Sequence, residues 1–269
     1  MNTPVRGRLS TINPLIKLAA TFPPLVFVLF VRDTATPALI AVGAAVVILA
    51  GTRVRVRTVV IAAAVVLFLG AWTTLLFALL ARRELVADSP VVVDGWITLH
   101  ADALDLGAAT ALRLIAIIML ALLGSAGTTT AGLSSALVRQ LHVPYRYVHS
   151  AMAAARFAPR YRDDLRTLRA AHRARGITDP AGPVGFVRRT RRSTIPLLAG
   201  GARYAERLSL AMDARGFGAY PHRSDRHPAT LRARDGLFLL GVWAGVAMVA
   251  ALTTDLGLLR WSGSLHGLG

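Results

Sequence analysis

The chain has 269 residues, of which 54% are hydrophobic, and it carries a net charge of +17. A soluble basic protein is rarely so apolar and a purely lipid-embedded protein is rarely so charged, so the two properties must be segregated along the chain. The absence of cysteine excludes disulfides, thiol nucleophiles and cysteine-ligated metals. The single lysine, Lys17, does not belong to a glycine-rich phosphate-binding loop, which excludes a P-loop ATPase.

Five apolar runs are candidate membrane-spanning helices, because a span needs about 20 mostly apolar residues. The first run follows Asn13-Pro14 and lacks a small-residue cleavage site, so we expect a retained span rather than a signal peptide. Pro23-Pro24 should kink this run, and the second run is the shortest. The five runs cover residues 14–31, 37–51, 58–80, 106–124 and 236–253.

The distribution of arginine predicts the orientation. Residues 130–234 hold 20 of the 31 lysines and arginines and 6 acidic residues, and Arg53, Arg55 and Arg57 lie between the second and third runs. The positive-inside rule places the N-terminus and both basic clusters in the cytoplasm. The acidic segment 82–105 then falls outside, and five spans would leave the C-terminus outside as well.

These patterns predict an all-α, polytopic membrane protein with about five transmembrane helices and additional amphipathic helices in the cytoplasm. We expect three regions. Residues 1–129 form an N-terminal transmembrane region of about four spans, residues 130–234 a cytoplasmic region, and residues 235–269 a final span and tail.

The basic region contains two predicted amphipathic helices. Between Pro144 and Arg175, apolar residues recur every three or four positions with arginines on the opposite side. Pro159 predicts a kink or a junction between two helices. After a polar linker at residues 178–183, the second helix is expected to begin at Thr194 as N-cap, with a proline in its first turn. The apolar residues of the first helix are Phe157, Tyr161, Leu165 and Leu168.

The sequence Ala-x-x-Ala-Arg-Gly closes each of these helices, at Ala171–Gly176 and Ala211–Gly216. Random order would give roughly 0.07 copies of this motif. Capping explains one copy, because glycine adopts the left-handed cap and arginine lies at the negative end of the helix dipole. Two copies on parallel helices favour docking, since alanines let a tip enter a narrow groove and a guanidinium binds a carboxylate bidentately. The candidate residues are Ala174, Arg175, Gly176, Ala214, Arg215 and Gly216.

Other features accompany this pair. Residues 13–18 read Asn-Pro-Leu-Ile-Lys-Leu, Arg113 lies in the fourth run, three threonines follow at 128–130, and Arg156-Phe157-Ala158-Pro159 lies in the first amphipathic helix. With these, the chain resembles over nearly its whole length the transmembrane T component (EcfT/CbiQ-like family) of energy-coupling factor (ECF) transporters. These are ABC-type importers of vitamins and metal ions, and the family shows similar Pro-x-x-Lys-Leu and Arg-Phe-x-Pro motifs.

The resemblance implies a non-catalytic membrane subunit without a cofactor. Its two coupling helices would lie at the cytoplasmic side, with Arg175 and Arg215 paired to acidic residues of two ABC ATPase subunits. Helix faces would hold a separate substrate-binding membrane subunit, the S component, and ATP-driven closure would tilt it, with hinges at Pro159 and 178–183. Vitamins, their precursors, cobalt and nickel all remain candidate substrates, and the S component can be dedicated or shared.

Three further observations have two interpretations each. Arg113 is costly inside a membrane, so it is either functional or an internally paired structural residue. The many small residues in 37–51 and 106–131 favour close helix packing, within the chain or against the S component. His222, Asp225 and His227 are metal-ligand types, but their proline-rich context favours solvated side chains. We expect no metal site and find no catalytic constellation.

The alternative function is a membrane-anchored basic module that binds anionic lipid or nucleic acid, since clustered arginines near a membrane attract anionic lipid. Against it, the arginines lie on structured helices that end in a repeated motif, and base-stacking aromatics are not evident. We therefore expect the spans to lie in the lipid bilayer, and we expect no nucleic-acid partner. A membrane enzyme acting on an isoprenoid would need an acidic cluster for a metal and diphosphate. An ordinary ABC permease usually has one coupling helix per chain.

Overall fold

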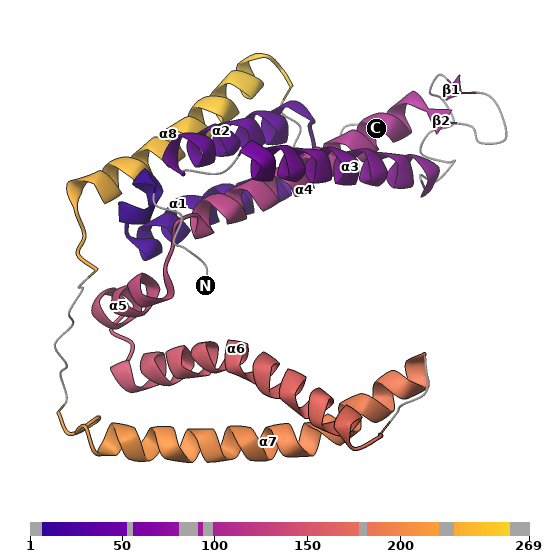
Figure 1. The fold of residues 1–269 in the computed structure, drawn as a ribbon. Helices are drawn as coiled ribbons and strands as arrows, with labels where there is room; N and C mark the ends of the chain where they lie inside the picture. The colour runs from indigo at the N-terminus through magenta and orange to yellow at the C-terminus, as the bar shows by residue number, and fades with distance from the viewer. Residues whose placement is uncertain are drawn as a thin grey trace, which may run out of the picture. The chain divides into compact units, whose positions relative to one another are not determined.

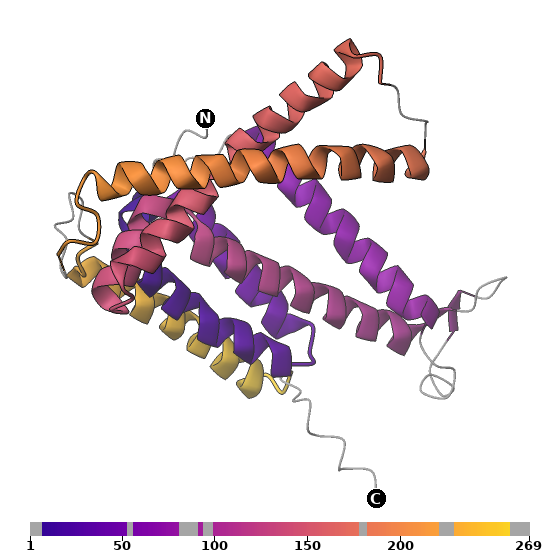
Figure 2. The same ribbon diagram turned by 90° about the horizontal axis from the view of Figure 1, so that it is seen from below.

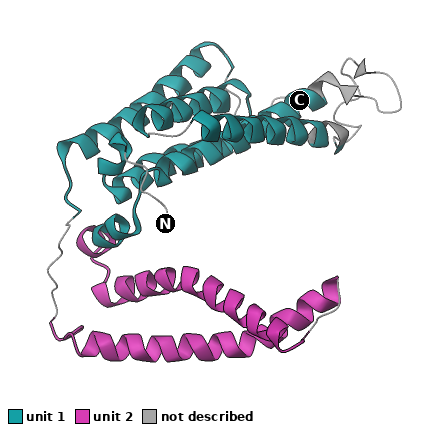
Figure 3. Cartoon of the chain, in the orientation of Figure 1, with its two compact units in different colours: residues 1–136, 229–269 teal, residues 137–228 magenta. Residues whose placement is uncertain are grey.

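The computed structural model describes residues 7–52, 56–80, 91–93, 99–177, 182–220 and 229–258. Within these ranges the chain is almost entirely helical (Figure 1). It divides into two compact units (Figure 3). One comprises residues 1–136 together with 229–269, and the other comprises residues 137–228.

The first unit contains five long apolar helices, one for each predicted span. Three of them are long and apolar enough to cross a membrane, and the other two are apolar helices of 17 residues each. In α3 none of the apolar window is buried inside the unit, as expected for side chains that face lipid. The predicted all-α polytopic membrane fold is therefore confirmed. The helices are α1 (Pro14–Phe30), α2 (Ala35–Gly51), α3 (Val56–Leu80), α4 (Ala101–Ser125) and α8 (Ala233–Asp255).

Two short pieces of this unit were not predicted. A 3-10 turn at Arg8–Thr11 precedes α1, and the strands β1 (Val91–Val93) and β2 (Leu99–His100) form a small antiparallel ribbon between α3 and α4. The two strands are too short to show an alternation of apolar and polar residues from which a strand could be predicted.

Helix α4 is central to this unit because it packs against α1, α2 and α3. Its small residues permit close approach. A Cβ on Gly107 would lie 2.6 Å from the carbonyl oxygen of Thr74 in α3, and one on Gly124 would lie 2.7 Å from Oγ1 of Thr21 in α1. In α2, Ala44 is buried in the same core. Gly107, Gly124 and Ala44 thus serve packing within the chain.

Polar contacts join the start of α1 to the end of α4 and the start of α8. Lys17 is fully buried, and its Nζ donates to the carbonyl oxygen of Ala126 at 2.7 Å and to Oγ1 of Thr128 at 3.3 Å. Asp235 is buried and accepts from the backbone N–H of Asn13 at 3.0 Å and of Arg232 at 2.8 Å. These bonds bring the N-terminal and C-terminal parts of the sequence into one unit.

The second unit is built on two long helices, α6 (Tyr145–Ala174) and α7 (Pro183–Asp213). The short helix α5 (Thr130–Gln140) contains the boundary between the units. This helix was not predicted. Thr129 caps its start, since Oγ1 of Thr129 accepts the backbone N–H of Gly132 at 3.1 Å.

The second long helix differs from the sequence expectation at its start, whereas the first continues through Pro159 as one helix, so of the predicted kink or junction it is not the junction that is found. α6 runs unbroken through Pro159, and α7 begins eleven residues before Thr194, so Thr194 is not its N-cap. The basic run at residues 188–192, which was expected to precede this helix, lies within it, because Pro183 opens the helix and Pro196 lies inside it. Both helices bend partway along their length (Figure 1), as expected where an internal proline cannot donate a backbone hydrogen bond.

Candidate functional site

Helices α6 and α7 cross at an aromatic contact. The ring of Phe157 stacks on that of Tyr204, with centroids 5.1 Å apart and planes inclined by 29°. A Cβ on Gly201 would lie 3.6 Å from the Phe157 ring, an ordinary van der Waals distance, so Gly201 faces this ring at the crossing. The guanidinium carbon of Arg160 lies 5.2 Å from the Tyr204 centroid, a cation–π distance. Within the Arg156–Pro159 motif, Phe157 therefore supplies the crossing contact.

The helices run in opposite directions. At the start of α6, the hydroxyl of Tyr145 donates to the carbonyl oxygen of Tyr220 at 3.1 Å, and Arg146 donates to that of Gly218 at 2.8 Å. At the end of α6, His172 lines a cavity together with Phe186, near the start of α7. The expected parallel arrangement is therefore wrong, and the two Arg-Gly ends lie at opposite ends of the crossed pair (Figure 2).

Both Arg-Gly ends have the same backbone geometry. Gly176 and Gly216 have φ of +69° and +67°, the left-handed region that favours glycine. The backbone N–H of Gly176 donates to the carbonyl oxygen of Arg173, and that of Gly216 donates to the carbonyl oxygen of Asp213. In each case the N–H of the next residue donates to the carbonyl oxygen of the residue five positions before it. This is the Schellman motif, formed twice with equivalent bonds. The predicted glycine caps are confirmed.

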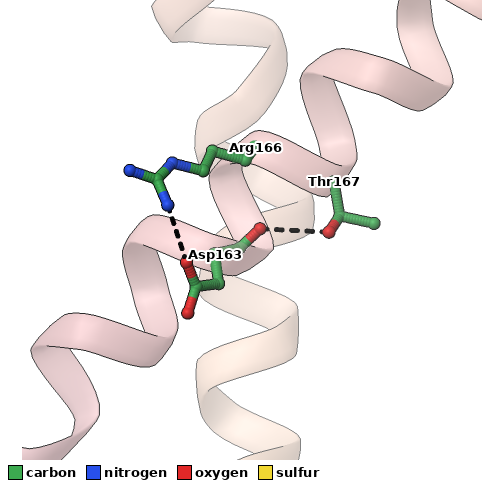
Figure 4. Close-up of polar contacts among 3 residues, drawn as sticks. All are labelled: Asp163, Arg166 and Thr167. Atoms are coloured by element: carbon green, nitrogen blue, oxygen red, sulfur yellow. Dashed lines mark hydrogen bonds and ion pairs between the residues drawn. The ribbon is translucent and has the colours of Figure 1, made fainter. Parts of the chain in front are cut away.

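The arginines at these ends point to solvent. Arg175 and Arg215 are exposed, and so are Ala174 and Ala214 before them. Neither guanidinium forms an ion pair or hydrogen bond with any part of the chain that the structure describes. Arg166 of α6, nine residues before Arg175, instead pairs with Asp163 at 3.1 Å (Figure 4).

A groove of about 770 Å³ lies between the start of α6 and the end of α7. Arg156 and Arg215 both line it, so the structure places the supporting arginine beside one tip rather than between the two. Its aromatic wall consists of Tyr145, His149 and Phe217, whose rings meet edge to face at 5.5 to 6.3 Å. The tip at Arg215 thus forms part of the lining of this groove.

A second cavity of about 540 Å³ lies between the end of α6 and the first half of α7. Basic residues dominate its lining, and sequence reasoning missed it. The signal is the spacing i, i+3, i+4, which places each set on one helix face. The main residues are Arg169, His172 and Arg173 of α6 and Arg189, Arg192 and Ser193 of α7.

Arg113 lies in α4 of the first unit. Its Nε donates to the carbonyl oxygen of Val31 at 2.9 Å, and its Nη2 donates to the same oxygen. Val31 is the C-cap of α1, so Arg113 satisfies a helix-end carbonyl. The contact favours the structural interpretation of this arginine.

Several predicted features fall outside the described residues. They include Arg53 and Arg55, the candidate metal-ligand types at 222–227, the linker residues 178–181, and 82–90 with 94–98 of the acidic segment.

Comparisons with known proteins agree with the family to which the motifs point. A family model described as CbiQ, cobalt transport protein, matches residues 7–227. A putative ABC transporter ATP-binding protein of Bifidobacterium longum (strain NCC 2705) is 24% identical over 259 residues. That similarity covers 93% of this chain and 33% of the other, so the chain spans about a third of the length of this relative.

Proposed function

The chain belongs to the CbiQ family of cobalt transport proteins, and we propose that it is the energy-coupling transmembrane subunit of an ECF-type ABC importer. As a transport protein of the membrane it carries no catalytic machinery of its own in this proposal. Two ABC ATPase subunits hydrolyse ATP, and this chain passes their movement to a separate S component that binds the substrate.

The observation that carries the proposal is the geometric identity of the two Arg-Gly ends. Each presents an exposed arginine beside exposed alanines, on a fixed Schellman turn at the end of a long helix. A paired structure of this kind fits a paired partner. A guanidinium can bind a carboxylate of each ATPase with two parallel hydrogen bonds, which a lysine cannot do.

The crossing of α6 and α7 supports the transmission of force. Because the Phe157–Tyr204 stack fixes the helices to each other, a displacement of one tip moves the other helix as well. The internal prolines provide bends at which the helices can flex. In this proposal residues 130–234 form the cytoplasmic coupling region, with the N-terminus on the same side.

The outer face of α7 supports an S component as partner. Val184, Val187, Ile195 and Leu198 recur at helical spacing and are 63 to 75% exposed. Such an apolar stripe suits a hydrophobic membrane subunit, to which α7 would be held while it transmits movement. The cargo in this proposal is a vitamin or a transition-metal ion such as cobalt or nickel.

The test is charge reversal at the tips. We expect Arg175→Glu and Arg215→Glu each to weaken copurification of the ATPase subunits and to abolish ATP-driven uptake in proteoliposomes. The matched control is Arg203→Glu, the same change of charge at an exposed position inside α7. If the tip variants retain uptake at the control level, the two arginines do not couple the ATPases. Binding of anionic vesicles that falls equally in all three variants would favour the lipid-binding alternative.

A further inference from the structure

Two segments connect the first unit to the second along the chain. The chain leaves the first unit after Ala136 and returns to it at Ala229. A hydrogen bond joins the two segments, because the backbone N–H of Ala229 donates to Oγ of the buried Ser135 at 2.9 Å. We call residues 126–136 the outgoing connection and residues 229–232 the return connection. Any displacement that passes along the chain between the units has to pass through these two segments.

The outgoing connection is bound to residues 10–17, which comprise the end of the 3-10 turn and the first turn of α1 and are called the N-terminal segment. Nζ of Lys17 donates to the carbonyl oxygen of Ala126 at 2.7 Å. The next residue, Gly127, has a φ of +65°, and a Cβ on it would lie 2.9 Å from the backbone nitrogen of Ser10. A side chain at position 127 would therefore be strained and would push the outgoing connection away from the N-terminal segment.

The return connection is bound to the same N-terminal segment. Asp235, in the first turn of α8, is buried and uses both of its carboxylate oxygens. Oδ2 accepts the backbone N–H of Arg232 at 2.8 Å, and Oδ1 accepts that of Asn13 at 3.0 Å. Arg234 adds a hydrogen bond from Nη2 to the carbonyl oxygen of Thr11 at 2.6 Å. Both connections therefore meet on one short segment of the chain.

We propose that the N-terminal segment is the anchor that joins the two connections, so that a movement of the second unit reaches the membrane helices as one displacement of α1. Lys17 and Asp235 are its positioning residues, because each is buried and each bonds the N-terminal segment to one connection. A buried charged group is costly unless it is bonded, so neither bond is readily exchanged for water. α1 packs against α4 and α8, and these contacts carry the displacement into the unit. The anchor needs no partner protein, whereas the transmission of ATP-driven movement rests on the proposed function.

The test of the anchor is backbone hydrogen exchange of the purified full chain in a non-ionic detergent. Every variant carries Ser135→Ala, which removes the direct bond between the two connections. Lys17→Met then frees the outgoing connection from the N-terminal segment, and exchange is measured at Arg232, on the return connection. The matched control is Thr36→Val, which removes the buried hydrogen bond between Oγ1 of Thr36 and Oγ1 of Thr253, near the other end of α8.

One net hydrogen bond shifts an opening equilibrium by roughly two- to tenfold, so we expect Lys17→Met to speed exchange at Arg232 by at least about threefold. The control should change exchange there by less than about 1.5-fold. No effect of Lys17→Met, or an equal effect of the control, would overturn the anchor. If Lys17→Met does not fold, Asp235→Asn replaces it, with exchange measured at Gly132 on the outgoing connection and judged by the same criteria.

The transmission of movement is tested in the complex of the full chain with the two ATPase subunits. While ATP is hydrolysed, exchange at Asn13 in the N-terminal segment should change by at least about twofold. ATP hydrolysis without such a change would overturn transmission through α1. ATPase subunits that do not copurify with the unmodified chain would refute the proposed function instead, and the exchange measured on the chain alone would then decide the anchor by itself.

Discussion

The glycine at each arginine tip offers a quantitative test of the proposed docking geometry. An alanine in the left-handed region costs about 1–2 kcal/mol, whereas it lowers the entropy of the unfolded chain by about 0.4–1 kcal/mol. A Cβ on Gly176 would meet nothing within 4 Å, and one on Gly216 would lie 4.0 Å from Ala219, so no clash adds to this cost. The net penalty for Gly176→Ala or Gly216→Ala is therefore about 1 kcal/mol, which raises the equilibrium constant for opening of the tip about fivefold.

Two measurements follow this change. Amide hydrogen exchange should speed up about fivefold at Ile177 or Phe217, whose N–H groups close the Schellman turns. If only the native tip binds, affinity for the ATPase subunits should fall in proportion to the native population of the tip, and by no more than about fivefold. Gly200→Ala is the control, because this helical glycine also has free space around its Cβ and should be stabilised by about 0.5–1 kcal/mol. ATPase affinity that does not follow the native population of the tip measured by exchange would refute a role for tip geometry.

Three further predictions concern the first unit and are measured by thermal unfolding in detergent. Lys17→Met leaves the carbonyl oxygen of Ala126 without its donor and should destabilise by about 1–3 kcal/mol, whereas an unchanged midpoint would show that the contact contributes nothing. Asp235→Ala removes the acceptor of two backbone N–H groups and should lower the free energy of unfolding by at least about 2 kcal/mol. Asp235→Asn should lower it by less. Gly107→Ala forces α3 from α4 at Thr74 and should cost about 1–3 kcal/mol, while Gly245→Ala, which meets nothing within 4 Å, should not destabilise.

The membrane helices could be predicted because the signal is composition over a long window. All five apolar runs are helices, with ends that differ by a few residues from the predicted bounds. Both glycine caps could be predicted as well, since a left-handed cap follows from local chemistry. Local rules suffice where a segment's own residues decide its conformation.

The arrangement of the site could not be predicted in the same way. Thr194 and Pro196 imitate a helix start, so the second helix was predicted to begin eleven residues too late. The antiparallel crossing depends on Phe157 meeting Tyr204, a contact between positions 47 residues apart that no local pattern encodes. The basic cavity could not be predicted for the same reason, because its two arginine pairs come from helices that meet only in the folded chain.

The absence of cysteine permits a direct test of the central claim, that both tips touch ATPase subunits. Ala174→Cys and Ala214→Cys place one thiol beside each arginine, and a photoactivatable cross-linker on that thiol reports what lies next to it in the assembled transporter. Each position should cross-link to an ATPase subunit, and labelling by an impermeant maleimide should occur from the cytoplasmic side alone. Cross-links to lipid only, or labelling of the two thiols from opposite sides of the membrane, would contradict the account.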